Sequence, residues 1–181
     1  MPLSAPAPRE SLHTRQIECR GFRRKDGLWD IEAHLTDVKS YEIESDWRGN
    51  LAPGKPVHDM WVRLTLDGDL RIHAIETASD ATPYELCPNV VENYQALVGL
   101  RVAPGWNRQV RSRVGGVNGC THITELMNVL ATVAFQTIFS LREKDLMAAG
   151  DRKPPMLDSC HAWDSSGPVV KAQYPAWYAG D

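Results

Sequence analysis

The segment Gly119-Cys120-Thr121-His122 places a thiol and an imidazole directly before a long stretch of helical periodicity. Free N–H groups at the start of a helix create a positive field, which favours the thiolate form of a cysteine. A thiolate attacks electrophiles and binds soft metals, and an imidazole two residues away can carry a proton. We therefore predict that Cys120 and His122 belong to a site. The alternative is that Cys120 is a buried packing residue, as many free cysteines are.

Glu32 and His34 form a second candidate pair. A spacing of two along a strand puts both side chains on one face, where they could act as an acid and a base or as metal ligands. The alternative is that this face is simply the solvated side of a sheet.

His58 and Asp59 open another expected strand. Adjacent strand residues point to opposite faces, so only one of them is expected to enter a given pocket unless a bulge redirects the chain. Cys87 precedes Pro88 at a second expected helix start. Cys160 and His161 lie near the C-terminus, where they could close a site or be an incidental surface pair.

The elements that must position these residues are read from hydrophobic periodicity. Apolar residues alternate with polar ones in the second of four expected strands, which are residues 15–23, 28–37, 58–66 and 70–77. Helical spacing and Pro or Gly signals predict helices over residues 88–99, 106–113 and 121–148. Strands followed by helices predict an α+β fold, an antiparallel sheet of about four strands with helices on one face.

The chain is expected to form one domain. We predict a flexible arm over residues 1–14, a single α+β domain over 15–150, and an irregular tail over 151–181 that packs on that domain.

The composition of the chain argues against several classes of binding partner and cofactor. A formal net charge of -3 argues against nucleic acid or an anionic membrane surface. Because no run of 18 apolar residues is present, no segment is expected to span a bilayer. The N-terminal residues lack the features of an export signal, so a cytoplasmic location with four reduced cysteines is expected. Neither a GxGxxG motif after a strand nor a P-loop is found, which argues against a nicotinamide, flavin or nucleotide cofactor.

Several uncommon blocks occur in order along the chain: GFRR, DGLWDIE and HLTD, then HDMW and RLT, then GWxR, GCTH, EL and CHAW. In these blocks the chain resembles DUF2889, a bacterial family of unknown function, over about residues 15–178. Members often lie near genes for degrading aromatic compounds, so the resemblance implies an aromatic, lignin- or phenylpropanoid-like substrate.

A second resemblance concerns layout. The order of an aspartate at a strand start, a hairpin and cysteines at two helix starts is similar to the NifU-like iron–sulfur scaffold. This resemblance implies a metal site of Asp59, Cys87 and Cys120. Val57 replaces the first cysteine of that pattern, and His58 could substitute for it. Such a set suits zinc or iron.

Two functions follow as hypotheses. The first is a metal-dependent enzyme acting on an aromatic compound by a lyase-type or hydrolytic step, in which the metal polarises a substrate oxygen while Glu32, His34 or His122 moves a proton. The second is a non-catalytic metal or iron–sulfur carrier or accessory protein. An interaction domain without a site, and a homo-oligomer of either kind, stay open.

Overall fold

The computed structural model describes residues 3–148 and 153–181. These residues divide into two compact units, Met1–Ile138 and Phe139–Asp181, and each is described by itself. The predicted boundary between residues 150 and 151 lies outside the described residues. The predicted packing of 151–181 on the main domain stays a prediction.

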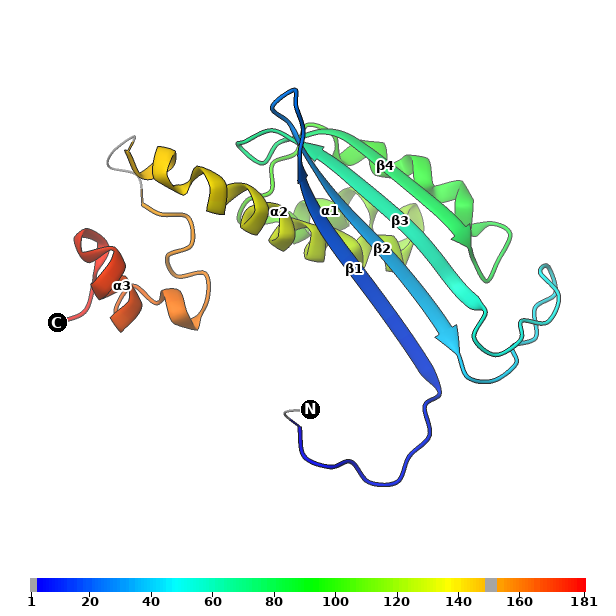
Figure 1. The fold of residues 1–181 in the computed structure, drawn as a ribbon. Coiled ribbons are helices and arrows are strands. Elements are labelled where there is room, and N and C mark those ends of the chain that lie inside the picture. Colours follow the sequence, from blue (N-terminus) through cyan, green and yellow to red (C-terminus); the bar gives the residue numbers. More distant parts are fainter. Residues whose placement is uncertain (1–2, 149–152) are drawn as a thin grey trace. The chain divides into compact units, whose positions relative to one another are not determined.

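The first unit is built on one antiparallel sheet with strand order β1-β2-β3-β4 (Figure 1). The strands are β1 His13–Arg23, β2 Trp29–Lys39, β3 Pro56–Leu66 and β4 Ile72–Ala81. Each strand pairs with the next along the chain. The helices that follow complete an α+β fold, so this prediction is confirmed.

The helical segments come after the sheet in sequence. They are η1 Cys87–Leu97, a 3-10 helix, then α1 Trp106–Val114, the short 3-10 turn η2 Gly116–Asn118, and the long helix α2 Thr121–Ala148. Expected and observed bounds differ by only a few residues. The main difference is that the helix expected over residues 88–99 is a 3-10 helix that ends at Leu97.

One face of the sheet carries the core, and we call it the inner face. On β2 the alternation predicted from the sequence buries Trp29, Ile31, Ala33 and Leu35. Their partners on β3 are equally buried, from Met60 to Leu66 in steps of two. These side chains form one hydrophobic cluster with residues of η1, α1 and α2. Apolar burial of this extent is the main force holding the helices against the sheet.

Helix α2 supplies the largest helical contribution to this core. An apolar stripe with helical spacing is buried at Ile123, Met127, Leu130, Ala134 and Ile138. Leu141, the next apolar residue at this spacing, is 65% exposed. The indole Nε1 of Trp106 donates to the Met127 carbonyl oxygen at 3.0 Å, which ties α1 to the middle of the stripe.

The expectation that no segment spans a bilayer stays a prediction. Within the described residues, Thr121–Arg142 of α2 is long and apolar enough by length and composition. The core helix of a soluble protein passes the same test, and the α2 stripe is part of the core. The first unit is therefore compatible with a soluble protein.

Helix α2 passes very close to β1 at Gly21. A Cβ atom at position 21 would lie 2.2 Å from Thr137 Oγ1 and 2.6 Å from Thr137 Cγ2. Only glycine allows this approach.

The second unit begins within α2 and, after it, the described residues form three short helical segments, η3 His161–Trp163, α3 Pro168–Gln173 and η4 Pro175–Trp177. Among its described residues, Phe139, Met156, Leu157 and Val170 are buried apolar residues. The expectation of an irregular segment missed α3, whose start is set by Pro168 in the first turn.

Candidate functional site

Asp37 is the most buried charged residue at the inner face and lies toward the end of β2. It continues the odd-numbered alternation of the apolar residues, so its side chain points inward and is only 2% exposed. In the register of the sheet it lies opposite His58 of β3, immediately before a bulge between Asp37 and Val38. A carboxylate in this position must be compensated by donors.

Four hydrogen bonds compensate the Asp37 carboxylate. Arg15 donates from Nε to Oδ1 and from Nη2 to Oδ2, each at 2.8 Å. His13 Nε2 lies 3.0 Å from Oδ1, and His58 Nδ1 lies 2.9 Å from Oδ2. The in-plane lone pairs of both oxygens are thus used. Burial alone would raise the pKa of Asp37, but the hydrogen bonds from Arg15 and His13 outweigh it and hold the pKa well below its usual range.

The first turn of α2 brings His122 and Cys120 to the same place. His122 Nε2 lies 3.8 Å from Asp37 Oδ2, and the His122 and His58 rings are 3.8 Å apart between centroids. Cys120 Sγ lies 3.7 Å from His122 Nδ1 and 4.0 Å from Met60 Sδ. We refer to His13, Arg15, Asp37, His58, Cys120 and His122 together as the Asp37 cluster.

Tyr94 of η1 holds the start of α2 in position. Its buried hydroxyl accepts the N–H of Cys120 at 3.0 Å and donates to the Cys120 carbonyl oxygen at 2.9 Å. Gly119 is needed for the close turn before it, since a Cβ there would lie 2.1 Å from the Val114 carbonyl oxygen. The sequence Gly119-Cys120 thus fixes where the thiol sits.

Both inner imidazoles favour the neutral form. Burial lowers the pKa of His58, and the neighbouring His122 lowers it further. Burial also lowers the pKa of His122, with the positive charge of Arg15 as the next cause. Two neutral imidazoles therefore face each other beside a fully ionised carboxylate.

Three ligand-type atoms of this cluster could hold a metal ion. Within the described residues, donor atoms of Asp37, His58 and His122 all lie within 4.8 Å of one another. Two imidazoles and one carboxylate are a donor set used by iron and zinc proteins. The carboxylate is already saturated by its hydrogen bonds, so a metal would have to displace one of them.

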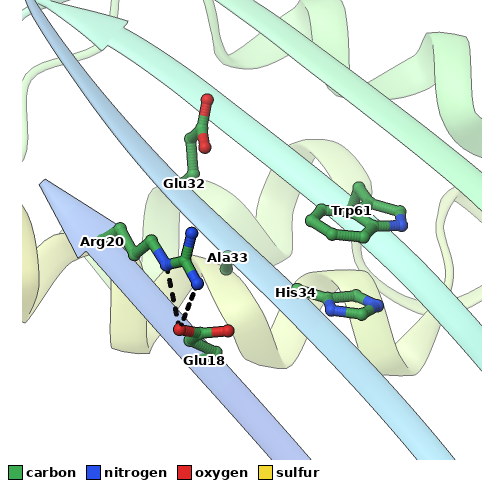
Figure 2. Close-up of a pocket in the computed structure, with 6 residues that line it drawn as sticks. All are labelled: Glu18, Arg20, Glu32, Ala33, His34 and Trp61. Atoms are coloured by element: carbon green, nitrogen blue, oxygen red, sulfur yellow. Dashed lines mark hydrogen bonds and ion pairs between the residues drawn. The ribbon is translucent and has the colours of Figure 1, made fainter. Parts of the chain in front are cut away.

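The opposite, outer face of the sheet carries the other sequence candidates. Glu32 and His34 lie on this one face, where Glu32 accepts from Arg63 Nε at 2.7 Å. His34 Nε2 lies 2.7 Å from Asp59 Oδ1, and its ring stacks on Trp61 with centroids 3.6 Å apart. Figure 2 shows the His34 and Trp61 rings beside each other, across from the paired Glu18 and Arg20.

A shallow pocket of about 60 Å³ lies among these outer residues. Its lining is Glu18, Arg20, Glu32, Ala33, His34 and Trp61 (Figure 2). A pocket that encloses a small organic molecule is usually about 300 Å³ or larger. The outer pocket can hold a few waters but cannot enclose an aromatic substrate.

The sheet thus separates the predicted site residues into two groups. Of the predicted acid and base residues, Glu32 and His34 lie on the outer face, whereas His122 lies in the Asp37 cluster. Of the predicted metal ligands, His58 faces inward and Asp59 outward, as expected for neighbours on a strand.

The predicted cysteine ligands differ in the same way. Cys120 belongs to the Asp37 cluster, where its Sγ lies next to His122. Cys87 is the first residue of η1, and within the described residues it is not part of the group of possible metal ligands. Cys160 is exposed in the second unit.

Sequence reasoning missed Asp37, Arg15 and His13. The signal for Asp37 was present, because it shares the odd parity of Trp29, Ile31, Ala33 and Leu35 and so belongs to the inner face. Arg15 and His13 have the same parity on β1, where they lie opposite Asp37 and Lys39.

Comparison with known proteins gives one match. A family model described as protein of unknown function (DUF2889) matches residues 13–136, which is well over half of the chain and spans every residue of the Asp37 cluster. Searches of curated proteins and of solved structures return no significant match, so the NifU-like resemblance is not confirmed. On the family match, the chain belongs to the DUF2889 family.

Proposed function

We propose that this protein is a small-molecule enzyme that transfers protons at the Asp37 cluster, in a lyase-type or hydrolytic reaction. The observation that carries the proposal is the 2.9 Å contact between His58 Nδ1 and Asp37 Oδ2. An ionised carboxylate only accepts, so Nδ1 carries the hydrogen and the lone pair lies on Nε2. A neutral imidazole oriented in this way is a general base.

The remaining members of the cluster supply what such a reaction needs. His58 removes a proton from the substrate or from water, and the Asp37 carboxylate stabilises the imidazolium that forms. His122, in contact with the Cys120 thiol, returns a proton to the leaving group or to a carbanion. Arg15 and His13 fix the Asp37 carboxylate and are positioning residues.

The proposed substrate is an aromatic, phenylpropanoid-like molecule, and the proposed location is the cytoplasm. The substrate class comes from the family resemblance. The location is supported by four cysteines that are all free thiols, as expected in a reducing compartment.

A second candidate is a metal-dependent enzyme with zinc or iron held by Asp37, His58 and His122. It is favoured by the approach of their three donor atoms to within 4.8 Å. A bound metal would polarise a substrate oxygen. An iron–sulfur carrier has less support. Such a carrier holds its cluster with several cysteines, and Cys120 is the single cysteine in the Asp37 cluster.

The test uses the purified full-length protein. Turnover of phenylpropanoid-like aromatics is measured for the wild type and for His58→Gln, with elemental analysis of both. His73→Gln is the matched control, since His73 forms a comparable 2.9 Å contact with Asp67 on the surface. We expect His58→Gln to lower kcat by about 100-fold or more and His73→Gln to leave it unchanged.

Metal content separates the candidates. Turnover without bound metal that survives a chelator supports proton transfer by the protein alone. Stoichiometric metal that is lost in His58→Gln together with turnover supports the second candidate. Stoichiometric metal without turnover supports a carrier, and neither metal nor turnover contradicts both proposals.

A further inference from the structure

Strand β1 is an edge strand of the sheet. Its free hydrogen-bonding edge, on the side away from β2, pairs with no other strand in the described part of the chain. The strand is 11 residues long, and each residue except the half-buried Cys19 is exposed. Residues 3–12, which precede it, are exposed as well and do not cover it (Figure 1). A long uncovered edge presents a row of free backbone N–H and C=O groups and is a template for another strand.

Two of the devices that block such an edge, proline and a bulge, are missing from β1, although the strand carries charged side chains at four positions, Arg15, Glu18, Arg20 and Arg23. The strand contains no proline, and its pairing with β2 runs from His13 to Arg23 without a bulge. Two of its large apolar side chains are exposed, Ile17 at 40% and Phe22 at 43%. The edge is therefore continuous and partly apolar, which suits strand addition.

We propose that β1 pairs with β1 of a second copy of this chain, antiparallel and centred on Cys19, to form an eight-stranded sheet. A two-fold axis perpendicular to the sheet keeps the inner faces of both copies on one side. Because side chains alternate between faces, this symmetry requires each residue to face one of the same parity. A single residue must then lie opposite itself at the axis.

Charge complementarity selects which residue lies on the axis. Centring on Glu18 or on Arg20 would place two like charges directly opposite each other, which destabilises a sheet. Centring on Cys19 places Glu18 of each copy opposite Arg20 of the other, on the exposed outer face. Glu18 and Arg20 already contact each other within β1 at 2.7 Å, so the axis would carry four alternating charges.

The same register places Arg15 of each copy opposite Arg23 of the other on the inner face, where Asp37 and Glu125 already compensate the Arg15 charge. Gln16 lies opposite the exposed Phe22, and Ile17 lies opposite Gly21. Centring on Ile17 would give an equally long overlap, but it places Glu18 opposite Gln16 and forms no charge pair. The occupant favoured by this edge is a second copy in the Cys19 register. This proposal is independent of the reaction proposed above.

The first experiment measures mass in solution. Sedimentation or light scattering over a concentration series is expected to give twice the chain mass of 20.2 kDa. Arg20→Glu should shift the protein towards monomer, because it places like charges opposite each other. The exchanged variant Glu18→Arg/Arg20→Glu should restore the dimer. A wild-type monomer at all soluble concentrations, or a dimer that the single reversal leaves intact, overturns the proposal.

The second experiment tests the register. Residues opposite each other across antiparallel strands have Cα atoms about 4.5–5.5 Å apart, within the range of a disulfide. Mild oxidation should therefore link two chains through Cys19, and Cys19→Ser should abolish the link. Cys160→Ser is the matched control, since Cys160 is exposed and should not be needed. Linkage that survives Cys19→Ser but is lost in Cys160→Ser overturns the Cys19 register.

Discussion

At the scale of single residues, Asp37 is the position on which the candidate site depends. Its carboxylate accepts from two strands of the sheet besides its own and is almost entirely shielded from water. Buried charge is tolerated only where donors satisfy it, so each partner of Asp37 is also constrained by it. The carboxylate orients the base and at the same time joins β1 to β3.

Replacing Asp37 by Asn should destabilise the protein by about 2 kcal/mol, as expected for losing charge-assisted hydrogen bonds. The amide nitrogen of Asn would also face a donor from Arg15 or His13. Urea unfolding measures the loss. Asp59→Asn is the matched control, because Asp59 binds His34 on the outer face, where 26% of its side chain is exposed. Equal losses for the two variants would contradict a special role of the buried carboxylate.

The pH profile of catalysis should have its acid limb below the ordinary titration of histidine. Burial lowers the pKa of His58, and the neighbouring His122 adds to this effect. A base must be neutral, so kcat/KM should rise through a pKa below about 6.5 and level off above it. His122→Gln removes one cause of the lowering and should move the limb to higher pH, apart from any loss of rate. A limb above 6.5 in the wild type would count against His58 as the base.

At the scale of elements, α2 crosses β1 at a close approach. It depends on Gly21, which meets the side chain of Thr137. Both elements contribute to the Asp37 cluster, β1 through Arg15 and α2 through His122. The spacing between them therefore sets the geometry of the site.

Gly21→Ala should cost about 1–3 kcal/mol, the usual range for overpacking. The added Cβ would lie 2.2 Å from Thr137 Oγ1, so strand and helix must separate. Thr137→Ala should recover part of the loss, which a double-mutant cycle by thermal unfolding measures. Additive effects of the two substitutions would show that the two positions do not compete for space.

The strands and helices could be predicted well from the sequence, whereas contacts between residues far apart in the chain could not. Alternation along residues 28–37 identified the inner face of β2. Asp37 is odd-numbered like the apolar residues of that face, so the same alternation indicates that its side chain points inward. His58 and His122 were recognised as candidates, but nothing local indicates that residues 64 positions apart meet. Arg15 contacts Glu125 across 110 positions, and the bulge after Asp37 depends on the neighbouring strand. Such pairings follow from strand order and helix placement, which local patterns do not specify.

At the scale of the whole molecule, stability should fall in two stages as the solution is acidified. The unfolded chain binds protons at histidine near pH 6.5, whereas folding lowers the pKa of His58 and His122. Stability is therefore lost as the pH falls below about 6.5. The pKa of Asp37 is also lowered by folding, so the stability it contributes above about pH 4 is lost below that pH.

Thermal unfolding across a pH series measures both stages. The double variant His58→Gln/His122→Gln should lose the first stage and keep the second. A melting temperature that stays constant between about pH 7 and pH 5 in the wild type would contradict the first stage.

The hydroxyl of Tyr94 has a consequence for the dynamics of the site. The first amides of a helix usually exchange rapidly with solvent, because no intrahelical acceptor protects them. The amide of Cys120 is instead bonded to a fully buried phenol on η1. Its deuterium exchange should be as slow as that of core amides in α2 and should accelerate when η1 undocks. The backbone beside the thiol would then report local opening of the core, and the thiol would reach its position only in molecules in which η1 has docked.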